Sequence, residues 1–275
     1  MKERLNALLK LLAALALGAG AAYLGAQAAL LIRSRALGGY GLDAQALQSA
    51  SLLLRYLYTG EGEIAMLGAF AAAACALLFA KELFRPLDAP FRAKWLCLLP
   101  LGLLLGWGTV ALLQSLDEIR YAGARSFGLL PQYACQLALS GALALLLRGC
   151  ITKAVHSAFG VKATLIVSAL TEGAAGLLLY GFSVLTAVNG LLFGALTALL
   201  YLEARSLWPE TLLRFGFLSG ARLLGAYPGG GAYWVSGSLW VGARHGLEGS
   251  LTLTILLLLA LSMYALAKQR RIPNG

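Results

Sequence analysis

The sequence predicts an all-α, polytopic membrane protein with about eight transmembrane helices in one bundle. Two observations lead to this prediction. Of the 275 residues, 60% are hydrophobic and only 12% are charged, whereas a soluble domain is about half apolar and a quarter charged. The charged residues are also grouped between long apolar runs, which is typical of helical membrane proteins. We therefore expect a single membrane domain over residues 1–275.

The apolar runs predict the individual helices, because a helix needs about 20 apolar residues to cross a bilayer. Suitable runs lie at residues 5–32, 64–84, 94–116, 127–147, 162–181, 183–202, 211–227 and 250–267. The first run is too long for a cleaved signal peptide, and no convincing small-x-small cleavage site follows it. We therefore expect this first run to be a transmembrane helix as well.

Two further segments are predicted to stay outside the bilayer core. Residues 43–58 follow a plausible helix cap at Asp43 but are too short and too mixed to cross, so we expect them at the interface. Residues 227–249 are rich in Gly, Trp and Tyr, which is typical of an outer loop anchored at the lipid headgroups.

The basic residues predict the orientation. With the N-terminus inside, the cytoplasmic segments contain about twice as many Lys and Arg residues as the outer ones, although Arg33 and Arg35 oppose this trend. Both termini are therefore expected in the cytoplasm. The net charge of +10 is assigned to these loops, so the predicted partner is the lipid bilayer and not a nucleic acid.

The remaining motifs indicate packing more than chemistry. The four cysteines have no CxxC spacing and are interpreted as small core residues. They are Cys75, Cys97, Cys135 and Cys150. The GLLFG stretch at 190–194 is interpreted as a close helix contact. His156 and His245 are predicted on opposite sides of the membrane, and both are interpreted as solvated or structural. The same interpretation applies to Glu61 and Glu63, which come without a histidine.

Three charged residues lie within or at the end of predicted spans. Arg148 alone is most simply a cation that reaches the cytoplasmic boundary. Glu172 lies about 15 Å beyond Lys162 at helical rise, and Arg214 reaches a comparable depth from Arg205. An isolated charge at the bilayer centre costs about 3 kcal/mol or more. We therefore expect Glu172 and Arg214 to compensate each other.

Glu210 is a second candidate partner for Arg214. It lies one helical turn earlier, so it could pair with Arg214 or interact with the N-terminus of its helix. Glu203 lies on the other side of the same connecting loop. The spacing alone leaves open whether Arg214 pairs with Glu172 or with Glu210.

Residues 143–220 contain the stretches LALLLRGCITKAVHSAFG, SALTEGAAG and NGLLFGALTALLYLEARSLWP. In these stretches the chain resembles the CPBP family of intramembrane metalloproteases, the CAAX-protease and bacteriocin-processing group. The stretch LALLLRGCITKAVHSAFG is similar to the family's Glu-Glu-x-x-x-Arg-Gly box and the basic segment after it. SALTEGAAG stands where the family has Phe-x-x-x-His. NGLLFGALTALLYLEARSLWP is similar to the span that leads into the family's Ser-Leu-Trp-Pro, and GLEGSL to its last loop. The resemblance implies a CAAX-protease-like bundle with residues 143–220 as its core.

The family's catalytic side chains are missing. The resemblance implies paired glutamates that activate a water, with two histidines and a glutamate holding a zinc-type ion. The glutamate positions are Leu143 and Ala144, the histidine positions Ala175 and Arg214, and a motif asparagine is Leu218. These side chains cannot ligate a cation. We therefore expect no catalytic residue, no metal and no cofactor, and zinc only if the site is rebuilt from other residues.

The predicted function is therefore binding by a catalytically inactive pseudoprotease. Arg148, Glu172 and Arg214 would line a cavity that takes a membrane peptide or a prenylated tail, or the chain would serve as a subunit of a membrane complex. Two alternatives stay open. One is an active CPBP endopeptidase with a rearranged site, and the other is a proton- or ion-coupled transporter that uses Glu172. The resemblance also implies a bacterial plasma membrane.

Overall fold

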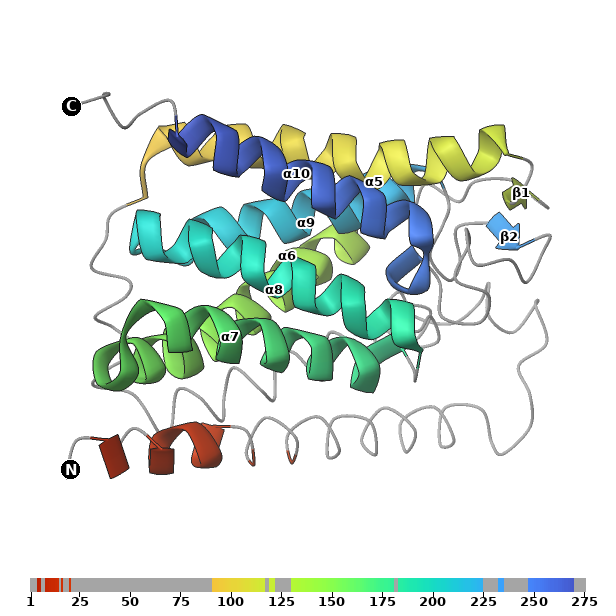
Figure 1. The fold of residues 1–275 in the computed structure, drawn as a ribbon. Coiled ribbons are helices and arrows are strands. Elements are labelled where there is room, and N and C mark those ends of the chain that lie inside the picture. Colours follow the sequence, from red (N-terminus) through yellow and green to blue (C-terminus); the bar gives the residue numbers. More distant parts are fainter. Residues whose placement is uncertain are drawn as a thin grey trace.

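The computed structural model is a bundle of helices that run back and forth along one direction (Figure 1). It describes residues 4–5, 8–14, 16, 20, 91–116, 119–121, 130–180, 183–224, 232–234 and 247–269. The predictions for the interfacial segment 43–58, the span 64–84, Cys75, Glu61, Glu63 and His245 lie outside these residues. The described N-terminal residues are helical, and Ala14 packs against Leu147 and Ile151 of the bundle.

Six α-helices make up most of the described part, and each corresponds to one predicted span. They are α5 (Leu98–Ser115), α6 (Leu130–Ala144), α7 (Lys153–Tyr180), α8 (Val184–Ala204), α9 (Trp208–Leu223) and α10 (Leu251–Gln269). The short helix η2 (Ala93–Cys97) precedes α5, the π-helix η3 (Leu145–Thr152) joins α6 to α7, and η5 (Leu247–Gly249) precedes α10. The prediction of an all-α architecture is confirmed.

Four of the described helical segments are long and apolar enough to cross a membrane. They are Ala93–Ser115, Gln136–Leu177, Val184–Ala204 and Leu251–Lys268. The expected number of about eight spans is thus not reached within the described ranges. One reason is α9, whose 16 residues correspond to about 24 Å, shorter than a bilayer core. Another is that α6, η3 and α7 form one continuous helical segment.

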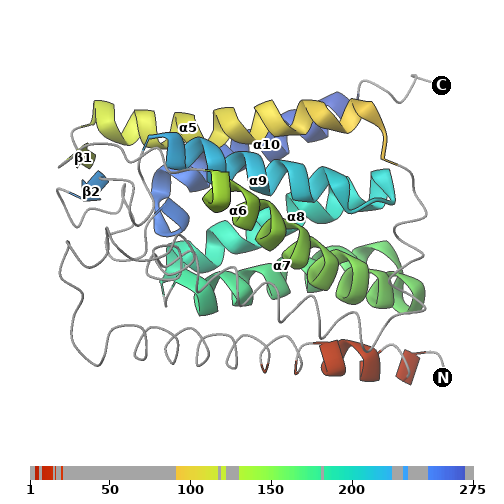
Figure 2. The ribbon, with the colours of Figure 1, turned by 180° about the vertical axis from the view of Figure 1, so that it is seen from behind.

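This continuous segment reverses direction at Gly160. Gly160 has φ 77° and ψ −172°, a conformation that only glycine adopts without strain. Side chains pair symmetrically about it, because Thr152 Oγ1 lies 2.7 Å from Ser168 Oγ, and Arg148 Nη2 lies 3.0 Å from Glu172 Oε2. Residues 136–177 are therefore a helical hairpin. Figure 2 shows α6 running diagonally from beside α9 to the hairpin end of α7.

Glycines bring neighbouring helices into backbone contact. Gly102 and Gly106 of α5 face Gly216 and Gly220 of α9, and a Cβ on any of the four would overlap a backbone carbonyl oxygen of the other helix. Gly190 and Gly194 of α8 also lie close to α7, because an added Cβ would come within 2.7 Å of Gly173 Cα and 2.6 Å of Glu172 Cβ, respectively. The interpretation of GLLFG as a packing motif is confirmed. Helices in lipid lack a hydrophobic driving force for association, and close van der Waals packing at small residues stabilises the contact instead.

The loops after α5 and α9 meet at one end of the bundle. β1 (Ile119–Tyr121) and β2 (Ala232–Trp234) pair antiparallel, with Arg120 opposite Tyr233. The described residues of segment 227–249, which was predicted as an outer loop, thus form the strand β2 and the short helix η5. The described N-terminal residues and the end of α10 at Gln269 lie at the opposite end of the bundle (Figure 1).

The outer surface of the bundle is apolar, as expected for helices that face lipid. Large apolar side chains point outward on several helices, among them Leu104 of α5, Ile166 of α7 and Met263 of α10. Cys150 is buried as predicted. The prediction for Cys97 is wrong, because this residue is exposed on η2, where its Sγ lies 2.9 Å from the carbonyl oxygen of Lys94.

The contact between α5 and α9 gives a test of the packing. Gly106→Ala places a methyl group on the backbone of Phe217, and we expect it to lower the free energy of unfolding by about 1–3 kcal/mol. Gly108→Ala is the matched control on the same helix, because a Cβ there meets no atom within 4 Å. The control should be neutral or up to about 1 kcal/mol more stable, since alanine favours helix. Unfolding by SDS titration in micelles measures both. Equal effects would contradict the close packing.

Candidate functional site

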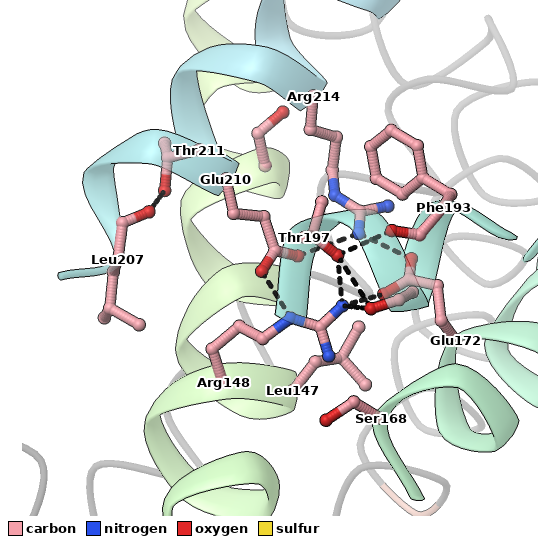
Figure 3. A network of polar contacts seen from close by, with 12 residues as sticks. Leu147, Arg148, Ser168, Glu172, Phe193, Thr197, Leu207, Glu210, Thr211 and Arg214 are labelled. Carbon is pink, nitrogen blue, oxygen red and sulfur yellow. Dashed lines mark hydrogen bonds and ion pairs between the residues drawn. The ribbon is translucent and has the colours of Figure 1, made fainter. Parts of the chain in front are cut away.

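Two arginines and two glutamates form a closed ring of ion pairs inside the bundle (Figure 3). Arg148 Nη2 lies 3.0 Å from Glu172 Oε2, and Arg148 Nε lies 2.7 Å from Glu210 Oε2. Arg214 Nη2 lies 2.9 Å from Glu210 Oε1 and also donates a hydrogen bond to Glu172 Oε1. Each arginine therefore contacts both glutamates. We call these four residues the four-charge network.

The four-charge network is buried and its formal charges cancel. Arg148 is 0% exposed and Glu210 is 1% exposed, and Glu172 and Arg214 are buried as well. Removing ions from water costs several kcal/mol per ion unless opposite charges and hydrogen bonds replace the lost hydration. All four carboxylate oxygens lie within ion-pair distance of a guanidinium, so opposite charges compensate each other within the ring. Removal of any one of the four side chains would leave an uncompensated charge in the interior.

Three helical segments bring the four residues together. Arg148 projects from η3, and Glu172 comes from the returning arm of the hairpin in α7. Glu210 and Arg214 lie on successive turns at the start of α9, in which Pro209 is the second residue. Glu210 in the first turn also interacts favourably with the helix dipole. The network therefore ties α9 to both arms of the hairpin.

Hydroxyl groups and a carbonyl complete the surroundings of Arg148. Its Nη2 donates to Thr197 Oγ1 and, at 3.4 Å, to the carbonyl oxygen of Gly194, both in α8. Its Nη1 donates to Thr152 Oγ1 at 3.4 Å, and this hydroxyl lies 2.7 Å from Ser168 Oγ. A fourth helix thereby takes part in the site, and the guanidinium of Arg148 is enclosed on all its described sides.

Arg214 has a different environment, because it borders a cavity. Its guanidinium carbon lies 4.7 Å from the centre of the Phe193 ring, which is favourable for a cation over an aromatic face. The adjoining cavity has about 60 Å³ of space for the centres of water molecules. Its wall is mainly apolar, with charged or polar groups at a few positions. It is lined by Leu143, Glu172, Ala175, Gly176, Thr186, Asn189, Gly190, Phe193, Arg214, Phe217, Leu218, Glu248 and Leu253.

Four of the motif positions identified in the sequence meet at this cavity. Leu143 comes from α6, Ala175 from α7, and Arg214 and Leu218 from α9, and all four belong to the lining. Ala144 does not line the cavity, because it is fully buried against Tyr201 and Leu207. The structure therefore gathers side chains that are up to 75 residues apart in the sequence at one place.

The predicted contact between Glu172 and Arg214 is present. Arg214 does not choose between Glu172 and Glu210 but contacts both. The interpretation of Arg148 as a cation at the membrane boundary is wrong, because the π-helix turns this side chain into the interior. The structure thus brings together all three residues assigned to the cavity, although Arg148 lies behind the four-charge network and outside the lining.

Sequence reasoning named Glu210 as a possible partner of Arg214 but did not assign it to the cavity site, and it missed Thr197 and Ser168. The four-residue spacing from Glu210 to Arg214 was a usable signal, since it places both side chains on one helix face. The hydroxyl residues carry no such signal. Two other predictions concern isolated residues. His156 is half-buried within α7 and not in a solvated loop. Glu203 is exposed and accepts a hydrogen bond from Tyr264 at 2.7 Å.

The side chains around the cavity do not fit a metal ion. In the part of the chain that the structure describes, no group of three or more His, Cys, Asp or Glu residues is placed to hold one. The buried carboxylates of Glu172 and Glu210 are each contacted by two guanidinium groups, which would repel a cation. We therefore derive no chemical step through a metal.

Comparisons with protein-family models, with curated proteins and with solved structures find no match to this chain. The functional argument therefore rests on the site itself.

The four-charge network makes a prediction about stability. Glu172→Gln or Arg214→Met leaves an unbalanced buried charge, and each should lower the free energy of unfolding by about 3–5 kcal/mol. The double variant keeps the balanced Arg148–Glu210 pair, whose Nε–Oε2 distance is 2.7 Å. It should therefore lose about 0.5–3 kcal/mol less than the sum of the two single variants. SDS titration of all three proteins measures this coupling.

Glu203→Gln is the matched control for these variants. It removes an exposed carboxylate from α8 and should change the free energy of unfolding by less than about 0.5 kcal/mol. Strictly additive effects of the two network substitutions would contradict a coupled network.

Proposed function

We propose that this chain is a membrane-embedded relative of the CPBP proteases that binds a hydrophobic or prenylated peptide and does not cleave it. One observation carries the proposal. The positions at which the resemblance expects catalytic side chains, Leu143, Ala175, Arg214 and Leu218, come from three helices and line one cavity. A chance similarity of short motifs gives no reason for these positions to converge, so their convergence supports a shared ancestral site.

The chemistry of the site supports binding over hydrolysis. Hydrolysis of a peptide bond needs an activated nucleophile or a metal-bound water and a group that moves protons. Among the residues that the structure describes, the cavity lining contains no histidine, cysteine or serine. Of its two glutamates, Glu172 has each carboxylate oxygen in contact with an arginine. Glu248 belongs to η5, and no histidine, cysteine or serine accompanies it among the described lining residues.

The shape and polarity of the cavity support a ligand with an apolar body and a small polar end. Its wall is largely formed by Leu143, Phe193, Phe217, Leu218 and Leu253, whereas Glu172 and Arg214 are charged. Pockets for organic ligands combine apolar walls with a few placed polar groups in this way. The cavity volume is too small for a whole prenyl chain, so we assign it to one end of the ligand.

The proposed setting is a bacterial plasma membrane with both termini in the cytoplasm. Four helical segments of membrane-spanning length and composition support the membrane location. The described N-terminal residues and the end of α10 lie at one end of the bundle, which supports termini on one side. A transporter is less well supported, because Glu172 is engaged by two guanidiniums and is not free to carry a cation.

Binding of a defined peptide tests the proposal. A fluorescent farnesylated peptide should bind saturably to the protein in nanodiscs and stay intact when zinc is added. Ala175→Trp fills the cavity, so it should weaken binding by at least about tenfold, which corresponds to about 1.4 kcal/mol. Ile166→Trp is the matched control on the same helix, because Ile166 is 61% exposed. Fluorescence anisotropy measures binding, and mass spectrometry detects cleavage.

Two outcomes would contradict the proposal. Zinc-dependent cleavage of the peptide would favour an active endopeptidase with a rearranged site. Equal affinity of both tryptophan variants would remove the cavity from the binding site. The same peptide without the farnesyl group shows whether the lipid part is recognised.

A further inference from the structure

The exposed cations of the described part of the chain gather at one end of the bundle. They belong to the described N-terminal residues, η2 and the residues before it, the hairpin turn, the α8–α9 connection and the end of α10, which lie together at that end (Figures 1 and 2). These exposed residues are Arg4, Arg92, Lys94, Lys162, Arg205 and Lys268. We call them the basic end. The described cations of the opposite end are Arg120 of β1 and the buried Arg222.

The basic end carries an excess of positive charge. No ion pair joins any of its six side chains to a described carboxylate. Of the described carboxylates, only Glu203 is exposed at this end, and it accepts a hydrogen bond from Tyr264 at 2.7 Å. The described part of this surface therefore attracts anions.

Three of the cations lie at the level where the membrane-spanning segments begin and end. Arg92 directly precedes the segment Ala93–Ser115, Lys94 is its second residue, and Arg205 directly follows the segment Val184–Ala204. The ends of such segments mark the boundary between the hydrocarbon core and the lipid headgroups. These three charges therefore stand at headgroup depth, where an anionic lipid carries its phosphate.

An aromatic pair joins the two elements that carry these cations. The rings of Phe91 and Trp208 have centroids 5.3 Å apart and meet edge to face at 78°. Arg92 follows Phe91 in the chain, and the Cα atom of Arg205 is no more than about 11 Å from that of Trp208 by chain length. Cations from η2 and from the α8–α9 connection thus surround one aromatic contact.

The backbone and the rings suit this depth. Arg205 has φ 52°, a left-handed conformation that turns the chain from α8 into α9. Lys94 Nζ lies 4.5 Å from the centre of the Trp95 ring. Phe91 and Trp208 are 45% and 39% exposed, and aromatic rings with one wet edge are typical of the membrane interface. A positive charge rule for loops accounts for the cations but not for this grouping with rings.

Apolar side chains continue from the cations along the lipid-facing side of the same helical segment. Leu96, Leu101 and Leu104 are 48%, 54% and 64% exposed. They follow Lys94 in the chain and lead from headgroup depth toward the middle of the bilayer. A molecule with an anionic head and apolar chains matches this order of cations, rings and leucines.

We propose that Arg92, Lys94 and Arg205, grouped around the Phe91–Trp208 pair, form a binding site for the headgroup phosphate of one anionic phospholipid. Basic groups between membrane helices bind lipid headgroups by the same attraction. A lipid held there connects η2 to the start of α9, which carries Glu210 and Arg214 of the four-charge network. This inference does not depend on the proposed peptide binding, because it concerns a different surface.

Native mass spectrometry of the full chain in detergent tests the site. The protein is mixed with equal amounts of phosphatidylglycerol and phosphatidylcholine that have the same acyl chains, so the two lipids differ in the net charge of the headgroup. One cation near an anionic headgroup contributes about fivefold in affinity, so we expect the first bound lipid to be phosphatidylglycerol with a preference of at least about tenfold. An equal population of both lipids in the first adduct would overturn the proposal.

Two double variants separate a local site from a general effect of charge. Arg92→Gln with Lys94→Gln removes two cations of the site, and it should lower the preference for phosphatidylglycerol at least about fivefold. Lys162→Gln with Lys268→Gln is the matched control, because it removes two exposed cations of the same basic end and should lower the preference less than about twofold. Equal losses in both variants would show diffuse attraction and overturn the site.

Arg205→Asn tests the other side of the site, and asparagine tolerates the left-handed conformation of this residue. The variant should also bind phosphatidylglycerol with a lower preference. A second readout is the thermal unfolding midpoint, since a ligand that binds only the folded protein stabilises it. Phosphatidylglycerol should raise the midpoint of the unchanged protein more than phosphatidylcholine does, and this difference should shrink in Arg92→Gln with Lys94→Gln. An undiminished difference would contradict binding at these residues.

Discussion

The mutual compensation of four buried charges is the constraint on which the rest of the site depends. Neither Arg148 nor Glu210 has contact with solvent, and each would be costly alone in an apolar bundle. Their ring with Glu172 and Arg214 is possible only if η3, α7 and α9 keep fixed positions relative to one another. The four charges therefore fix the position of α9 relative to the hairpin, in addition to any part in ligand binding.

Small residues allow the helices to approach closely enough for these ion pairs to form. Gly194 lets α8 approach α7 so closely that an added Cβ would lie 2.6 Å from Glu172 Cβ. The same approach brings the Gly194 carbonyl and Thr197 to Arg148. On the other side of α9, the paired glycines of α5 and α9 allow backbone contact. Close helix packing and charge compensation thus support each other, because the short distances between charges require short distances between helices.

Much of the fold could be predicted from the sequence because membrane helices need long apolar runs. The predicted spans from residue 94 onward agree with α5–α10 to within several residues at most boundaries. The pairing of Glu172 with Arg214 could be predicted as well, since both lie at similar depth and opposite charges compensate in lipid.

Other features depend on contacts that no local pattern encodes. Depth alone placed Arg148 at the boundary, whereas the wider turn of the π-helix and the reversal at Gly160 direct it toward Glu172. The joint contact of Arg214 with two glutamates required the position of α9 beside the hairpin. The pairing of β1 with β2 joins loops that are more than 100 residues apart, and three-residue strands leave no periodic signal.

The neutral network also separates this site from a hydrolytic one. Two guanidinium groups stand where a cation would have to sit near Glu172 and Glu210, and Leu143, Ala175 and Leu218 offer no ligand atoms. The cavity that remains is mainly apolar and borders a fixed polar surface. Such a site can recognise a ligand by shape and hydrogen bonds without activating water, which is the physical content of the proposed binding function.

The most direct test of this account is the metal content of the purified full-length protein. The protein is dialysed against trace zinc in detergent and analysed by elemental mass spectrometry. Because the guanidinium groups already compensate both carboxylates, the account predicts far less than one metal ion per chain. One tightly bound ion per chain would contradict it, and it would mean that the arginine ring is not the state of the site in solution.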